Sequence, residues 1–347
     1  MPSVSTRRYA AIRSGTPASK GRGDSRVMMT RTRIIANNGL RMRIAEAGEA
    51  GDPLVILAHG WPESWYSWRH QIDALAGAGF HVIAPDMRGY GDTDAPSDVR
   101  AYDIVHLAAD MVGIVDEARA DQAAIIGHDW GSVVAWHAAL LHPNRFRAVA
   151  ALSVPYFGPP REAPTKIWKQ RHGDRFYYIL YHQEPGVAEA EYDANPEGLL
   201  RMLYSSPDTP RHAPIITDQH KDAGGWIGRW GMPKTLPQWL SEEDLEYYVG
   251  EFSRAGFRGG INYYRNFDRN HELMENVDPV VKIPALFNVG DQDLVIAGMN
   301  REQLEQRMRP VVPHLRHIEW LEGAGHWIQQ ERPEECNRAL VAFLQDL

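Results

Sequence analysis

Short apolar runs separated by stretches of helical length constrain most strongly what this chain can fold into. The runs cover residues 53–58, 81–85, 123–126, 148–154 and 285–289. A run with almost no polar residue is typical of a strand that is buried on both faces of a parallel sheet. Parallel neighbours need crossover connections, and residues 64–78, 104–118 and 132–141 are long enough to form helices. The order therefore predicts an α/β fold with a doubly wound, mostly parallel sheet.

The alternation stops after Val154, and this divides the chain. Residues 156–275 hold many aromatic residues and several Pro and Gly but no apolar strand run, so we predict a helical lid there. The pattern resumes at Ile283 and ends with an amphipathic helix over about 334–344. We expect residues 31–155 and 276–347 to form one α/β core, which begins with a hairpin turned at residues 37–39.

The first thirty residues have a different composition from the rest. They are rich in Arg, Ser, Gly and Pro, carry Asp24 as their one acidic residue, and show no apolar periodicity. We predict a disordered basic leader over residues 1–30. Met28 or Met29 as the true start, and a transit peptide, stay open as alternatives.

Composition excludes several classes of function. The formal net charge of the 347 residues is −8 despite the basic leader, so the body is acidic and nucleic acid is not the expected substrate. No run approaches the length of a membrane span, and no apolar secretory signal precedes the core. The single cysteine, Cys336, excludes an internal disulfide framework. We expect a cytoplasmic protein that uses neither membrane nor metal.

The sharpest local motif is Gly127-His128-Asp129-Trp130-Gly131, directly after an apolar run. Two small residues flanking a central side chain allow a strand to reverse sharply into a helix, which exposes that side chain at the edge of the sheet. The central residue here is Asp, and a turn Asp that merely caps the next helix is the alternative. The motif predicts that Asp129 is a carboxylate nucleophile.

A second motif, His59-Gly60-Trp61-Pro62, follows the run at 53–58. In this architecture such a loop supplies one backbone N–H to an oxyanion, and the residue after the nucleophile supplies another. The donors would be Trp61 and Trp130. The alternative is an ordinary strand-to-helix turn, which would have the same sequence features. A cis bond between Trp61 and Pro62 is compatible with such a loop.

An acid and a histidine follow later apolar runs. Asp291 and Asp293 come after the run at 285–289, and His326 follows the short strand expected near 317–321. Carboxylate and imidazole at strand ends can act as an orienting acid and a base, in the chain order nucleophile, acid, histidine. Position along the chain alone does not decide whether Asp291 or Asp293 is the orienting acid.

Together these motifs resemble the soluble epoxide hydrolases of the α/β-hydrolase superfamily, from about residue 31 to the C-terminus. The resemblance implies a mostly parallel eight-stranded sheet with helices on both faces and an inserted helical lid. The chain resembles the single-module form of the family, because it leaves no room for the N-terminal phosphatase domain of vertebrate members. The residues that carry it are 59–69, Asp86-Met87-Arg88-Gly89-Tyr90-Gly91, 127–131 and Gln183-Glu184-Pro185-Gly186.

Carried over residue by residue, the resemblance implies Asp129 as nucleophile, Asp293 as acid and His326 as base. It also implies two lid tyrosines, Tyr178 and Tyr264. From the residues alone, Tyr177 and Tyr263 are alternatives to their neighbours, because adjacent helical residues diverge by about 100°. Aromatic packing within the lid is the other interpretation of all four.

The chemistry of an Asp nucleophile supports the same function. A carboxylate suits displacement at an sp³ carbon, and two phenols could donate to the departing oxirane oxygen. We therefore expect a cofactor-free epoxide hydrolase that acts on an apolar small-molecule epoxide in detoxification, with homodimer formation left open. A haloalkane dehalogenase with the same nucleophile, or a catalytically silent ligand-binding protein, is the alternative.

Overall fold

The eight strands form one sheet in the order β1-β2-β4-β3-β5-β6-β7-β8. The computed structural model describes residues 30–296 and 298–347, so the predicted disordered leader lies almost wholly outside the described residues. Strands β3 to β8 pair in parallel, whereas β1 and β2 form the predicted N-terminal hairpin and pair antiparallel. The strands are β1 Arg31–Asn37, β2 Leu40–Ala47, β3 Leu54–Ala58, β4 His81–Pro85, β5 Ala123–His128, β6 Phe146–Leu152, β7 Ala285–Gly290 and β8 Leu315–Leu321.

Side chains of one central strand enter two separate hydrophobic cores. Leu54 and Ile56 of β3 belong to the core on one face of the sheet, and Val55 and Leu57 belong to the core on the other. This follows from the twofold alternation of side chains along a strand. A strand covered on both faces reads as a continuous apolar run, which is why these strands are visible in the sequence.

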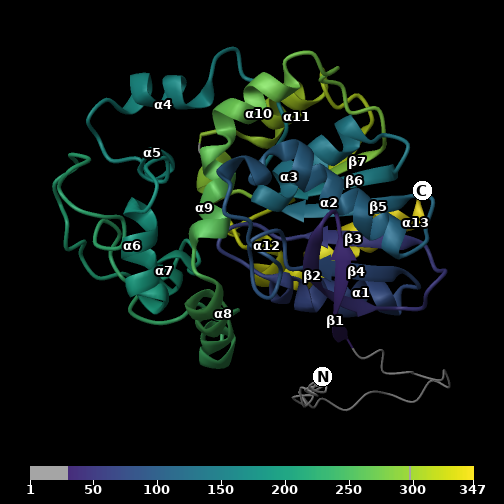
Figure 1. Cartoon of the computed structure of the whole chain (residues 1–347), viewed down its shortest axis with the longest axis horizontal. Helices are drawn as coiled ribbons and strands as arrows, with labels where there is room; N and C mark the ends of the chain where they lie inside the picture. The colour runs from purple at the N-terminus through teal and green to yellow at the C-terminus, as the bar shows by residue number, and fades with distance from the viewer. Residues whose placement is uncertain (1–29, 297) are drawn as a thin grey trace.

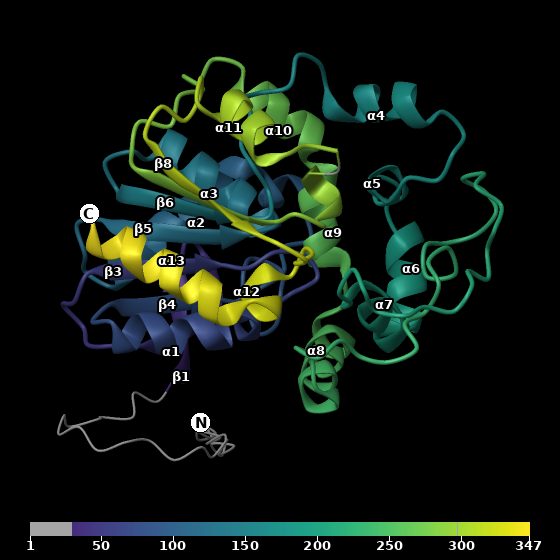
Figure 2. The same cartoon turned by 180° about the vertical axis from the view of Figure 1, so that it is seen from behind.

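Helices cover both faces, as predicted. Helices α2 and α3 lie over one face (Figure 1), and α1 and α13 lie over the other (Figure 2). The stretch at 64–78 differs from one expected helix, because Ser64 accepts a bond from the Tyr66 N–H and starts a separate 3-10 turn. The core helices are η1 Trp65–Trp68, α1 Arg69–Gly77, η2 Val99–Tyr102, α2 Ile104–Glu117, α3 Trp130–Leu141, η3 Leu294–Ile296, α11 Arg301–Met308, α12 Ile328–Glu331 and α13 Pro333–Gln345.

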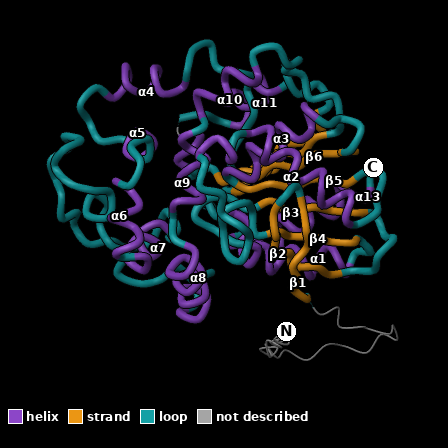
Figure 3. The backbone as a smooth tube through the Cα atoms, in the orientation of Figure 1, coloured by secondary structure: helices purple, strands orange, loops and turns teal. Residues whose placement is uncertain are grey.

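Between β6 and β7 the chain forms helices and long loops, which lie beside the sheet rather than within it (Figure 3). Tyr263 donates to the Arg88 carbonyl (3.0 Å), and Trp327 Nε1 donates to the Leu203 carbonyl (3.1 Å), so this insertion is bound to the core at α9 and at the end of α7. Its helices are α4 Pro164–His172, α5 Tyr178–Tyr181, α6 Val187–Ala194, α7 Pro196–Leu203, α8 Glu242–Ala255, α9 Arg258–Arg265 and α10 Phe267–Met274.

Candidate active site

The candidate residues of the core all follow strands of the parallel sheet. Trp61 comes after β3, Asp129 after β5, Asp293 after β7 and His326 after β8. Parallel strands present their carboxyl ends at one edge of the sheet, so four segments that are distant in the chain meet there. The two lid tyrosines approach the same place from α5 and α9.

Asp129 occupies a strained turn between β5 and α3. Its φ of 52° and ψ of −118° lie outside the regions that ordinary residues favour. The turn requires glycine on both sides, because a Cβ at Gly127 would come within 2.0 Å of the Gly131 carbonyl oxygen. A Cβ at Gly131 would likewise come within 1.9 Å of the Ala58 carbonyl oxygen. The local sequence therefore has the small residues that this geometry needs.

The two oxygens of the Asp129 carboxylate have different partners. Oδ1 accepts the backbone N–H of Trp61 at 2.8 Å, and Oδ2 lies 3.5 Å from His326 Nε2. The peptide bond between Trp61 and Pro62 is cis. Trp130, the other predicted amide donor, follows Asp129 directly as the first residue of α3.

His326 lies between two carboxylates. Its Nδ1 contacts both oxygens of Asp293, at 3.1 and 3.0 Å, while Nε2 faces Asp129. Asp291, the competing acid of the sequence, is bound elsewhere, because its Oδ1 accepts the N–H of Gly323 at 2.7 Å. The structure thus brings Asp293, and not Asp291, to the histidine.

Charge determines the protonation of this group. Burial by itself would lower the pKa of His326, but the negative charges of Asp293 and Asp129 raise it well above its usual value. Burial would raise the pKa of Asp129, yet the hydrogen bond and charge of His326 hold it below the usual value. The pKa of Asp293 is lowered in the same way, against the effect of its burial. In the free protein the histidine is therefore a cation between two carboxylates.

Tyr178 and Tyr264 come together above this group. Their ring centroids are 5.9 Å apart, and Tyr264 also contacts the Trp130 ring at 5.2 Å. Their neighbours face elsewhere: Tyr177 stacks on His172 at 4.0 Å, and the Tyr263 hydroxyl donates to the Arg88 carbonyl. The angular divergence of adjacent helical residues separates Tyr263 from Tyr264 in α9, whereas Tyr177 precedes α5 in extended backbone.

Burial first, and then nearby negative charge, raises the pKa of both phenols well above 10. The charge of Asp129 contributes at Tyr178 and at Tyr264. Both side chains therefore remain protonated at neutral pH, as hydrogen-bond donors must.

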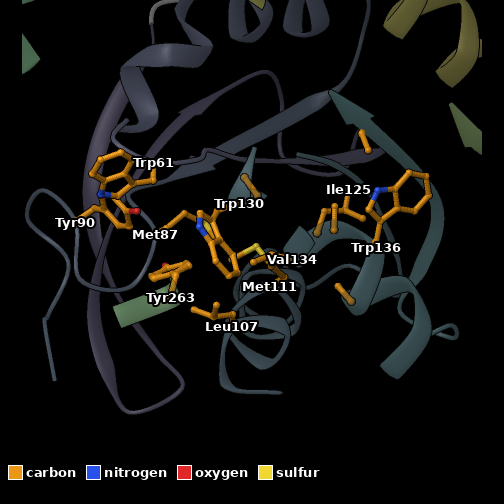
Figure 4. Packing of buried hydrophobic residues seen from close by; sticks show 14 of the residues in the cluster. Trp61, Met87, Tyr90, Leu107, Met111, Ile125, Trp130, Val134, Trp136 and Tyr263 are labelled. Carbon is orange, nitrogen blue, oxygen red and sulfur yellow. The ribbon is translucent and has the colours of Figure 1, made fainter. Parts of the chain in front are cut away.

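Aromatic rings form the wall of the site. Figure 4 shows Trp61 beside Tyr90, and Trp130 directed toward Tyr263. Trp61 stacks on Trp226 of the lid at 5.9 Å, and Trp226 stacks on Tyr178 at 4.5 Å. A wall of rings favours an apolar ligand.

The site is bordered by Glu63, a buried acid to which the sequence analysis assigned no function. Glu63 and His128 are fully buried and in contact, with His128 Nδ1 2.7 Å from Glu63 Oε2. Glu63 also accepts the N–H of Gly60 (2.6 Å) and the side-chain amide of Gln329 (2.9 Å). Glu63 therefore joins three separate segments around the site. Its local sequence resembles an ordinary loop, so only the residues that surround it identify its importance.

Within residues 30–296 and 298–347, His, Cys, Asp and Glu form no group of three or more that could hold a metal ion. In the same residues we find no helix with the length and apolar character needed to cross a bilayer.

Comparison with known proteins identifies the family. The chain matches the family described as alpha/beta hydrolase fold over residues 53–333. It is 46% identical to epoxide hydrolase A of Mycobacterium tuberculosis, over 91% of this chain and 97% of that protein. It is 38% identical to bifunctional epoxide hydrolase 2 of Sus scrofa, over 90% of this chain but 54% of that protein.

Solved structures agree with this assignment. The crystal structure of epoxide hydrolase A from Mycobacterium thermoresistibile matches with a TM-score of 0.84 and 47% identity, over 91% of this chain and 98% of that one. An epoxide hydrolase from an endophytic Streptomyces matches with a TM-score of 0.82 and 38% identity, over 91% and 95% of the two chains. The fold predicted from the sequence is confirmed, and the chain belongs to the epoxide hydrolase family of the α/β-hydrolase fold.

Proposed function

We propose that the chain converts epoxides into vicinal diols through an ester between Asp129 and a carbon of the oxirane ring. The observation that carries the proposal is that the two oxygens of the Asp129 carboxylate have different partners. Oδ1 is bound by the Trp61 N–H, which leaves Oδ2 available for attack on carbon. A carboxylate is suited to displacement at an sp³ carbon.

In the first step, Oδ2 of Asp129 forms a bond to one oxirane carbon, and the bond from that carbon to the ring oxygen breaks. The electron pair goes to the ring oxygen, which receives a proton from Tyr178 or Tyr264. The two phenols lie side by side and stay protonated, which supports this role.

The second step becomes favourable because the first removes a charge. Esterified Asp129 is neutral, so one of the two carboxylates that raise the pKa of His326 is lost. The histidine then releases its proton more easily, and this proton restores the phenol that donated to the ring oxygen, so that the neutral imidazole can accept a proton from water. That water attacks the ester carbonyl, and Asp293 stabilises the imidazolium that forms.

Backbone amides stabilise the charge that develops on the carbonyl oxygen. The Trp61 N–H already contacts Oδ1, the atom that becomes the oxyanion, and we assign the second donor to the Trp130 N–H. When the intermediate collapses, the bond between Cγ and the alkyl-bearing Oδ2 breaks, the departing oxygen takes the proton of the hydroxyl group newly added to Cγ, and the diol leaves with Asp129 again a carboxylate.

We assign this enzyme a small apolar epoxide as substrate, no cofactor, and a role in detoxification in the cytoplasm. The aromatic wall of Trp61, Trp130 and Trp226 supports an apolar substrate. A haloalkane dehalogenase would share the ester but would have no need of the two phenols, because a departing halide takes no proton.

Water enriched in heavy oxygen tests the two-step scheme. In a single turnover with enzyme in excess, the heavy oxygen should enter the peptide that contains Asp129, and the diol should take its new oxygen from the carboxylate. Mass spectrometry of both products measures this, with enzyme incubated without epoxide as control. Heavy oxygen in the first-turnover diol, with none in the protein, would show direct attack by water and reject the ester.

A further inference from the structure

The end of α7 brings the lid into contact with two loops of the active site. The Trp61 loop, residues 59–62, carries the amide that faces Asp129, and the His326 loop, residues 323–327, carries the histidine. Leu203 is the last residue of α7, and Tyr204 follows it directly. Tyr204 is fully buried, so its contacts with the two loops lie inside the protein.

The hydroxyl of Tyr204 donates to the carbonyl of Pro62 in the Trp61 loop. Burial raises the pKa of this phenol well above 10, so the hydroxyl keeps its proton and can donate. Among the described residues, no other donor is hydrogen-bonded to the Pro62 carbonyl. Tyr204 therefore holds the loop at the residue next to Trp61, whose N–H contacts Asp129 Oδ1 at 2.8 Å.

Trp61 thus has a bound neighbour on each side. The N–H of Gly60 donates to Glu63 Oε2 at 2.6 Å, and the carbonyl of Pro62 accepts the Tyr204 hydroxyl. The first of these bonds is formed within the core, whereas the second comes from the lid. The direction of the Trp61 N–H therefore depends on the contact between lid and core at Tyr204.

The same segment of the lid also binds the His326 loop. The carbonyl of Leu203 lies at the end of α7, where it has no partner within the helix, and it accepts Trp327 Nε1 at 3.1 Å. The Tyr204 and Trp327 rings are in edge contact, with centroids 4.9 Å apart. Trp327 contacts the His326 ring, also at 4.9 Å. Two consecutive lid residues therefore contact both loops.

Close packing fixes the position of this segment. A Cβ added at Gly325 of the His326 loop would lie 2.9 Å from Cδ of Pro207 in the lid. Arg211 donates to the Met202 carbonyl at 3.0 Å, which ties the end of α7 to the rest of the lid. The segment around Tyr204 is thus packed against the core on one side and held by the lid on the other.

We propose that Tyr204 is a positioning residue for hydrolysis of the ester, because its hydroxyl fixes the direction of the Trp61 N–H through the Pro62 carbonyl. The hydroxyl acts through the loop and touches neither the substrate nor the reacting atoms. Efficient hydrolysis then requires that the lid is seated on the core at Tyr204. This inference rests on the proposed function.

The two steps of the reaction make different demands on the Trp61 N–H. During ester formation negative charge leaves the Asp129 carboxylate, so the amide stabilises the starting state at least as well as the transition state. During hydrolysis negative charge develops on Oδ1, and a well-directed amide stabilises that transition state. Loss of the Tyr204 hydroxyl should therefore slow hydrolysis about three- to tenfold, the scale of one net hydrogen bond, and change ester formation less than about twofold.

Two conservative variants provide the test. Tyr204→Phe removes the hydroxyl and keeps the ring. Tyr248→Phe is the matched control, because Tyr248 is also a fully buried lid tyrosine, and its hydroxyl contacts the side chains of Ser67 (2.8 Å) and Gln330 (3.2 Å), outside both loops. Melting temperatures show whether the two variants lose similar stability.

The measurement follows the ester itself. Apolar terminal epoxides, aryl and alkyl, are mixed with excess enzyme, and the reaction is stopped with acid at graded times. Intact-mass analysis of the protein and analysis of the diol give separate rates for ester formation and ester decay. Tyr204→Phe should form the ester at nearly the wild-type rate and lose it about three- to tenfold more slowly, whereas decay in Tyr248→Phe should match the wild type.

The outcomes separate this inference from the proposed function. If the wild-type enzyme yields neither ester nor diol with any of these epoxides, the proposed function fails. If ester decays as fast in Tyr204→Phe as in the wild type, the inference alone fails. It also fails if ester formation slows by the same factor as decay, or if Tyr248→Phe slows decay equally, because either result would reflect a generally loosened lid.

Discussion

His128 Nε2 lies 2.8 Å from the main-chain carbonyl oxygen of His326. His128, which directly precedes Asp129 in the chain, thus contacts the backbone of His326, whose side chain faces Asp129. Ser153 donates to the same carbonyl at 2.7 Å. His128 thus has an acceptor beside each ring nitrogen, the Glu63 carboxylate at Nδ1 and the His326 carbonyl at Nε2.

Removing Glu63 should therefore destabilise the fold. Glu63→Ala removes the acceptor that faces His128 Nδ1, the Gly60 N–H and the side-chain amide of Gln329 in a fully buried place. We expect a loss of about 3–5 kcal/mol in the free energy of unfolding. Urea denaturation followed by circular dichroism measures it, with the exposed Glu246→Ala of α8 as control. A loss equal to that of the control would contradict the importance of the buried pair.

His326→Gln should trap the ester. Alkylation needs the Asp129 carboxylate and the phenols, whereas hydrolysis needs the base. Intact-mass analysis after addition of an epoxide should show the protein heavier by one substrate. Unmodified protein despite normal substrate binding would reject a covalent intermediate.

The double variant Tyr178→Phe and Tyr264→Phe should slow ester formation. It removes both donors to the oxirane oxygen and nearly preserves packing, so we expect a reduction of about 10²- to 10⁴-fold, with a smaller effect of either single change. Rapid-mixing measurement of alkylation gives the rate. Tyr177→Phe is the matched control, because that ring stacks on His172 and faces away. An unimpaired double variant that releases halide from haloalkanes would favour dehalogenase chemistry.

Asp293→Asn should shift the pH dependence of ester hydrolysis. The base works only when His326 is unprotonated, so hydrolysis falls as the pH drops below the pKa of that residue. The Asp293 charge raises this pKa, and its removal should move the acid limb of the profile to lower pH. The maximal rate should also fall, because the imidazolium loses its stabilising partner. Decay of preformed ester as a function of pH measures both effects, and an unchanged acid limb would assign it to another group.

Gly127→Ala should disrupt the turn between β5 and α3 that holds Asp129. The new Cβ would lie 2.0 Å from the Gly131 carbonyl oxygen, and backbone on both sides cannot move without displacing Asp129. We expect loss of activity together with a lower melting temperature. Gly250→Ala is the matched control, because it lies within α8 with no atom within 4 Å of the added Cβ. That control should be neutral or stabilising by about 0.5–1 kcal/mol.

The sequence by itself determined the elements whose signals are local. Buried parallel strands are continuous apolar runs, so β3 to β7 were visible, and the glycines around Asp129 revealed the turn because close backbone contacts exclude a Cβ. The motifs then identified the family. They also named Asp129, Asp293, His326 and the two lid tyrosines as candidates, roles that the experiments above test.

Tertiary structure decided what depends on packing between distant segments. Position along the chain did not decide between Asp291 and Asp293, because only the packing of β7 and β8 decides which carboxylate reaches the histidine. The sequence assigned Glu63 no role, since two of that residue's three partners, His128 and Gln329, come from distant segments. A sequence pattern reports the periodicity of one element, whereas the chemistry of a site depends on which elements meet.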